Sequence, residues 1–160
     1  MNTYLKIIIC TFIFLTGVSA IYSTAEAQIN REGSFGAGVI LGEPTGISLK
    51  LWTSSSTAMV GGIAWSFSGK SSMHLHTDYV WHNFSLAEVE EGTLGFYYGV
   101  GARVLLSGDD STLGVRIPLG INYIFSGAPL ELFAEIVPIF DLIPDTKFNG
   151  NGGLGLRFFF

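Results

Sequence analysis

The last eleven residues of the chain, GNGGLGLRFFF (Gly150–Phe160), carry the pattern that decides the fold. Leu154, Leu156, Phe158 and Phe160 alternate with small or charged residues, so one side of an extended strand is entirely apolar. The opposite side carries glycines and a single arginine, Arg157. Soluble domains usually end in polar residues, so this pattern indicates a strand whose apolar side does not face water.

The same alternation recurs along the chain from Gln28 onward, and no segment shows helical periodicity. Gly, Ser, Asn, Asp and Pro bound each segment. Most segments approach the roughly 9 to 11 residues with which a tilted strand crosses a bilayer. We therefore predict eight strands: 34–41, 46–53, 57–67, 73–84, 95–106, 113–125, 130–140 and 152–160.

The two faces of these strands differ sharply in chemistry. One face is apolar and carries no charge, for example Val39, Leu49 and Ile121. The other face carries many glycines and all the charges within the strands. Its predicted charged residues are Lys50, Asp78, Arg103, Arg116, Glu131, Glu135 and Arg157. Long charged side chains fit inside a narrow eight-stranded barrel only beside glycines, so we assign this polar face to the lumen.

Composition supports an outward apolar face. Hydrophobic residues make up 48% of the 160 residues and charged residues only 13%, about half the usual share in soluble domains. A soluble barrel with the opposite orientation would crowd its large apolar side chains into a narrow core. Outward apolar strands in lipid require a closed barrel, because every backbone polar group at membrane depth must be paired.

The N-terminus has the features of a secretory signal peptide. Lys6 precedes an apolar run, and small residues follow at Val18-Ser19-Ala20 and at Ala25-Glu26-Ala27. We favour cleavage after Ala27 over cleavage after Ala20, which gives a signal peptide over 1–27 and a barrel domain over 28–160. The only cysteine, Cys10, would leave with the signal. The basic residues occur singly, so no basic patch for nucleic acid exists.

The chain resembles small bacterial outer-membrane barrels of the OmpA transmembrane-domain and OmpX type. The resemblance rests on the alternating C-terminal residues and on the segments GAGVILGEPTGISLKLW (36–52), HLHTDYVWHNF (74–84) and PLELFAEIVPIFDLIPD (129–145). These segments look most like a family of short, largely uncharacterised outer-membrane barrels. The resemblance implies location in the outer membrane, contact with lipid and lipopolysaccharide, and no cofactor. It also implies that Leu154, Leu156, Phe158 and Phe160 form the signal read by the barrel-assembly machinery.

Two chemical alternatives involve the histidines. His74, His76 and His82 with Asp78 suggest a metal site, but ligands along one strand lie too nearly in line to surround zinc. His82 and Ser85 invite comparison with lipid A-modifying barrel enzymes, although the inward side of His82 separates the two groups. We therefore predict polar filling of the lumen, with no metal and no catalysis.

We predict a structural or surface-interaction protein whose lumen is closed by ion pairs, with Glu131 and Glu135 bridging arginines. A narrow ion-conducting pore is one alternative. The other is a binder or adhesin that holds an unidentified external ligand through its outer connections, predicted at 42–45, 68–72, 107–112 and 141–151. These are short, and the long acidic connection 85–93 lies on the opposite side.

Overall fold

A computed structural model describes residues 31–66, 72–87, 89–107 and 110–160, all within one compact unit, Arg31–Phe160. The expected signal peptide, Phe67 and most of the 68–72 connection lie outside these residues. No helix in the described ranges is long and apolar enough to cross a membrane.

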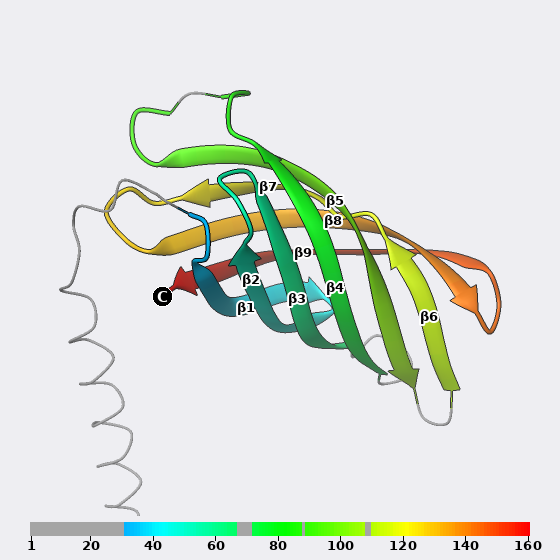
Figure 1. Cartoon of the computed structure of the whole chain (residues 1–160). Coiled ribbons are helices and arrows are strands. Elements are labelled where there is room, and N and C mark those ends of the chain that lie inside the picture. Colours follow the sequence, from blue (N-terminus) through cyan, green and yellow to red (C-terminus); the bar gives the residue numbers. More distant parts are fainter. Residues whose placement is uncertain (1–30, 67–71, 88, 108–109) are drawn as a thin grey trace, which may run out of the picture. The chain divides into compact units, whose positions relative to one another are not determined.

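The described chain folds into antiparallel strands (Figure 1). They are β1 (Phe35–Glu43), β2 (Thr45–Trp52), β3 (Thr57–Ser66), β4 (Ser72–Asn83), β5 (Thr93–Ser107), β6 (Asp110–Arg116), β7 (Leu119–Ile124), β8 (Leu130–Ile143) and β9 (Lys147–Phe159). Each strand pairs with the next around a ring, and β9 pairs with β1 to close it. The prediction of an all-β antiparallel barrel is confirmed.

The predicted single strand 113–125 is divided into β6 and β7. Both segments lie between β5 and β8, so the ring has eight positions although nine strands are described. The division falls at Pro118, which has no backbone N–H for a ladder hydrogen bond. The wall stays closed there, because Gly99 N donates to Pro118 O (2.9 Å) and Ile117 N donates to Pro138 O (3.0 Å).

The strand register gives the barrel its tilt. Facing residues can be followed once around the ring from Ala37 to Phe148. Ala37 itself faces Phe158, so one circuit is displaced by ten residues along β9, from 148 to 158. A stagger of this kind accompanies a strand tilt of about 35–45° and leaves an interior that side chains fill.

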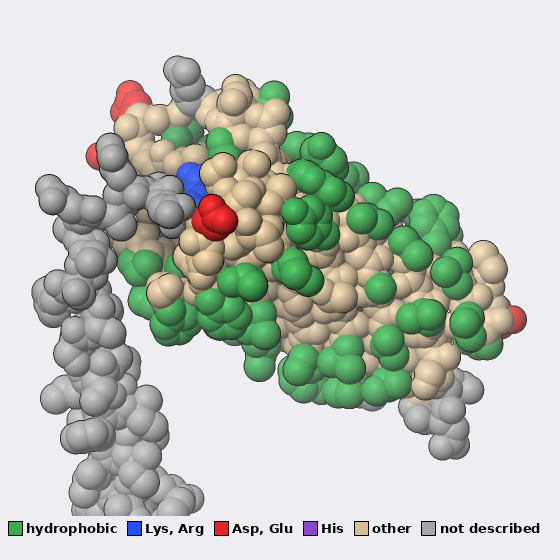
Figure 2. All heavy atoms as spheres, viewed as in Figure 1, with side chains coloured by type: hydrophobic (Ala, Val, Ile, Leu, Met, Phe, Trp, Pro, Cys, Tyr) green, Lys and Arg blue, Asp and Glu red, His purple; other side chains and the backbone are tan. Residues whose placement is uncertain are grey.

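The barrel wall has the apolar outer face and the polar inner face that the alternation predicts. Large apolar side chains are exposed on the outer face at each of the eight positions of the ring. Examples, with the exposed fraction of each residue, are Val39 (51%), Ile121 (53%) and Leu154 (63%). Figure 2 shows hydrophobic side chains spread along the flank, with acidic and basic groups only toward the two ends of this view. The charged side chains of the strands are mostly buried inside.

Three predicted connections prove to be largely parts of strands. Only Pro44 of the connection 42–45 lies outside strands, and residues 107 and 110–112 of the connection 107–112 belong to β5 and β6. Residues 141–151 were expected to form an external loop, but β8 continues to Ile143 and β9 begins at Lys147, which leaves only 144–146 outside strands. The register shifts at this point, because Leu113 faces Ile143 while Gly114 faces Asp141. This bulge inserts Leu142 as an extra residue and interrupts the apolar alternation. The strand therefore extends beyond the point at which its alternating pattern stops.

Adjacent glycines on β3 provide a test of wall packing. A Cβ on inward Gly62 would lie 2.6 Å from His76 Cε1 and 2.9 Å from the backbone oxygen of Ile47. On Gly61, the nearest atom would be His76 O at 3.6 Å, an ordinary contact. We expect Gly62→Ala to destabilise the barrel by about 1–3 kcal/mol and Gly61→Ala to change stability by less than about 1 kcal/mol. Urea unfolding in detergent measures both, and equal losses would contradict this packing.

Candidate functional site

The candidate site is the lumen, where the structure places all seven predicted charged residues. Six of them, Lys50, Asp78, Arg103, Arg116, Glu131 and Arg157, are buried, and the Glu135 side chain is 8% exposed. They come from β2, β4, β5, β6, β8 and β9. Their inward position follows from strand alternation, since each lies on the face opposite the exposed apolar residues.

A central cluster surrounds Glu131, whose side chain is completely buried. Its Oε1 accepts hydrogen bonds from Lys50 Nζ (2.5 Å) and Asn122 Nδ2 (2.7 Å), and its Oε2 accepts one from Arg157 Nη1 (2.8 Å). Arg157 also donates to Ser48 Oγ from Nε (3.0 Å) and Nη2 (2.9 Å). Glu131 therefore links a lysine of β2 to an arginine of β9. The sequence had led us to expect a link between two arginines.

A second group forms around Arg116. Its Nε donates to Asp78 Oδ1 at 2.9 Å, whereas its Nη2 lies 3.8 Å from Glu135 Oε1, which is too long for a hydrogen bond. The other oxygen of Glu135 accepts a hydrogen bond from Tyr97 Oη (2.8 Å). Glu135 thus joins Arg116 to a tyrosine and does not join two arginines.

A third pair contains a residue that sequence reasoning missed. Arg103 donates to both carboxylate oxygens of Asp141 at 2.8 Å, with a further bond from its Nε at 3.0 Å. Asn149 Nδ2 also donates to Asp141, at 2.5 Å. Residue spacing could have identified Asp141 as an inward residue, because it continues the odd-numbered inward series of Glu131 and Glu135. Pro144, three residues further along the chain, favoured a loop instead.

Aromatic rings pack together at the end of the lumen nearest the C-terminus, in a cluster that we call the aromatic plug: Trp52, His82, Phe84 and Tyr97. The His82 ring lies 4.4 to 5.7 Å from the three other rings. Lys50 Nζ lies 4.1 Å from the Trp52 ring centre and 3.0 Å from His82 Nε2. These contacts join the plug to the central cluster by cation–π attraction and a hydrogen bond.

Arg31 covers the plug from outside the strands. Its guanidinium lies 4.1 Å from the Phe84 ring centre and 5.6 Å from that of Trp52. Burial lowers the pKa of Arg31 below its ordinary value, while attraction to Glu131 raises it. The guanidinium keeps its charge over the relevant pH range, since an arginine is effectively always protonated.

The histidines do not assemble the sites considered as alternatives. Within the described ranges, no three His, Cys, Asp or Glu residues are grouped so as to hold a metal ion. His82 is buried in the plug, where its Nδ1 lies 3.3 Å from the backbone oxygen of Ser56. Ser85 is exposed, and its backbone N–H bonds Asn83 Oδ1. Among the contacts of the described residues, none joins the His82 ring, the candidate base, to the Ser85 hydroxyl, the candidate nucleophile.

On β9, the C-terminal residues are divided between the two faces. Leu154 (63%), Leu156 (43%) and Phe160 (79%) are exposed, Phe158 is half-buried and Arg157 is inside. Phe158 faces Ala37 of β1 and Leu130 of β8, so the last strand is paired on both edges.

Comparison with known proteins identifies the fold. No family model and no curated protein matches the chain. Among solved structures, the N-terminal β-barrel domain of Pseudomonas aeruginosa OprF is similar, with a TM-score of 0.59 and 15% identity. The match covers 81% of this chain and 98% of that domain. The chain therefore shares the β-barrel fold of that domain, and at this identity the likeness concerns the fold alone.

The central cluster generates a stability prediction. Glu131→Gln keeps the size of the side chain but leaves Lys50 and Arg157 without their shared carboxylate. We expect a loss of about 3–5 kcal/mol, because buried charges remain uncompensated. The matched control is Asp145→Asn, since the Asp145–Lys147 pair is about 70% exposed on both sides (71% and 68%) and contributes about 0–1 kcal/mol. Urea unfolding in detergent compares the two, and similar losses would refute the difference.

The Arg103–Asp141 pair generates a second prediction. Arg103→Met or Asp141→Leu alone should cost about 3–5 kcal/mol, because each strands one buried charge. The double variant should cost less than the sum of the two, with a coupling of about 0.5–3 kcal/mol. A double-mutant cycle of unfolding free energies measures this coupling. Additive losses would show that the two side chains do not act as a pair.

Proposed function

We propose that the protein is an integral outer-membrane β-barrel of a bacterium, with a structural or surface-interaction role and no catalytic activity. In this proposal the chain is exported by a signal peptide over residues 1–27. The domain from residue 28 onward then inserts into the membrane and contacts lipid and lipopolysaccharide.

The observation that carries the proposal is the inverted distribution of polarity. Large apolar side chains cover the outside of the wall, while Lys50, Glu131 and Arg157 are buried within it. Contiguous exposed apolar surfaces of this extent are rare on soluble monomers. In a bilayer the same surface is favourable, whereas an arginine on the lipid side would cost about 2–4 kcal/mol at the midplane.

The C-terminal strand supports a route of assembly. Leu154, Leu156, Phe158 and Phe160 stand at alternate positions on one side of the chain end. We propose that the barrel-assembly machinery recognises these residues before the strand pairs with β1. The apolar exposure of Leu154, Leu156 and Phe160 in the folded barrel is compatible with both recognition and later contact with lipid.

The lumen in this proposal is closed. Glu131 ties Lys50 to Arg157 at the centre, and the aromatic plug fills the end nearest the C-terminus. Both features argue against the narrow pore. The adhesin alternative would use the β8–β9 hairpin, where residues 142–150 are exposed, in place of the loop expected at 141–151.

The proposal predicts membrane behaviour that can be measured directly. Detergent-purified protein should migrate faster before heating than after heating on gel electrophoresis, because the closed barrel resists unfolding by detergent. In cells it should fractionate with the outer membrane. A Phe160 deletion should lower the amount of assembled barrel, with an Asp145→Asn variant as control. Protein found freely dissolved in the periplasm would refute the proposal.

Closure of the lumen is tested separately by planar-bilayer recording. The wild-type barrel should give no steady conductance steps, whereas simultaneous replacement of Trp52, Phe84 and Tyr97 by alanine should admit ions if the plug is the main barrier. Regular steps from the wild type would favour the pore.

A further inference from the structure

At the β1–β2 hairpin the barrel wall is short, because β1 ends while the neighbouring β9 continues. Glu43 faces Gly152 in the last pair between β1 and β9. Residues 147–151 of β9 face β8 on one edge, and on the other edge no partner strand is present among the described residues. This free edge is about 15 Å long at roughly 3.3 Å per residue. We call the gap beside it the notch.

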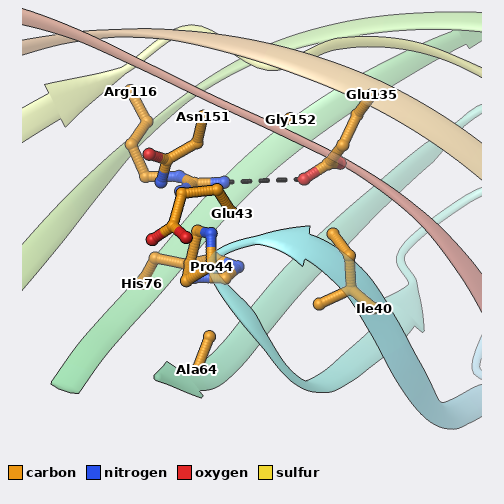
Figure 3. A pocket seen from close by; sticks show the side chains of 9 residues that line it. All are labelled: Ile40, Glu43, Pro44, Ala64, His76, Arg116, Glu135, Asn151 and Gly152. Carbon is orange, nitrogen blue, oxygen red and sulfur yellow. Dashed lines mark ion pairs between the residues drawn. The ribbon is translucent and has the colours of Figure 1, made fainter. Parts of the chain in front are cut away.

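Behind the notch lies a hollow that reaches into the lumen (Figure 3). Its walls are Ile40, Glu43, Pro44, Ala64, His76, Arg116, Glu135, Asn151 and Gly152. In Figure 3, the side chains of Arg116, Asn151, Glu43 and His76 converge on it from different strands. The space is small and not sealed, and its volume of about 10 Å³ has room for about one water molecule.

Two polar atoms at this hollow have no hydrogen-bond partner within the protein. Both Asn151 Nδ2 and His76 Nδ1 are buried and unbonded. The Arg116–Glu135 contact of 3.8 Å across the hollow is also longer than a hydrogen bond. A buried unsatisfied group costs about 1–3 kcal/mol, so such groups usually bond to an ordered water or ligand.

The hollow ends inside the barrel. Glu135 is bonded to Tyr97 of the plug, and the Glu131 cluster fills the lumen beyond it. Arg116 is neutralised by Asp78 and approached by Glu135, so the charges at the inner end are already compensated. A ligand there gains most from being uncharged and from both donating and accepting hydrogen bonds.

We propose that the notch is a lateral entrance to a blind vestibule, which holds an ordered water at Asn151, His76 and the Arg116–Glu135 pair and which small uncharged hydroxylic solutes approach from the side. The vestibule opens on the side of the barrel and does not continue through it. This inference rests on the barrel fold and concerns the same lumen as the proposed function. It does not depend on insertion of the protein into a membrane.

Two alanines of β3 provide a matched test. Ala64 lines the vestibule and Ala58 belongs to the apolar core beside the plug, yet both are 0% exposed. Ala64→Cys and Ala58→Cys are made in a Cys10→Ser background, and the folded barrels are treated in detergent with a small, uncharged hydroxyethyl thiosulfonate. We expect Ala64→Cys to react at least about tenfold faster, because thiol reaction requires access. Unheated gel migration verifies that each variant is folded.

The possible results separate the two proposals. Slow reaction at both positions would refute the vestibule and leave the closed lumen intact. Fast reaction at both would show that the plug is open, which would contradict both the closed lumen and the blind end. Fast reaction at Ala58→Cys alone would place the entrance at the other end of the barrel and refute the notch.

Asn151 provides the second variant. In the Ala64→Cys background, Asn151→Leu should slow the reaction severalfold, because it removes a polar ligand group and narrows the entrance. Asn151→Ser, which is smaller and keeps a hydroxyl, should leave the reaction as fast or faster. Equal rates in all three proteins would show that solutes do not pass Asn151 and would overturn the assigned route.

Discussion

The width of an eight-position barrel is the constraint on which the rest of the structure depends. With a circuit displaced by ten residues, the lumen holds side chains and little else. Glycines make this possible, because inward positions such as Gly155 lie against a ring: a Cβ there would come within 2.2 Å of Phe133 Cζ. Phe133 in turn lies 3.6 Å from the Arg157 guanidinium. The space beside a glycine of β9 is therefore occupied by an aromatic ring of β8, and that ring also contacts a cation of β9.

Charge balance follows from that confinement. In the described lumen, four cations and four carboxylates are buried: Lys50, Arg103, Arg116 and Arg157 against Asp78, Glu131, Glu135 and Asp141. A charge in this space has little water to solvate it, so each requires a partner. The pairs link β2, β8 and β9 through Glu131, and β4, β5, β6 and β8 through the two other groups. The contacts that cross-link the wall are also those that would close the lumen in the proposed function.

Strand alternation was sufficient to predict the two faces, because a period of two places every second side chain inside. It did not predict features that depend on partners distant in sequence. Pro118 divides a strand that its apolar pattern presents as continuous, and the bulge at Leu142 hides the end of β8. Asp141 was assigned to a loop for this reason, although Arg103 of β5 and Asn149 of β9 bond its buried carboxylate. Pairing of Glu131 with Lys50 likewise depends on the barrel's stagger, which no local segment specifies.

The two ends of the lumen differ because the hairpins differ in length. Near the C-terminus, Trp52, Phe84 and Tyr97 pack around His82. At the opposite end, β1 stops at Glu43 while β9 continues five further residues beyond their last pair, from 151 to 147. The polar atoms near this short hairpin include Asn151 Nδ2, which is buried without a hydrogen-bond partner. A longer β1–β2 hairpin would supply β9 with a neighbouring strand at this point, so the length of one turn determines where the edge of β9 and the hollow behind it remain approachable.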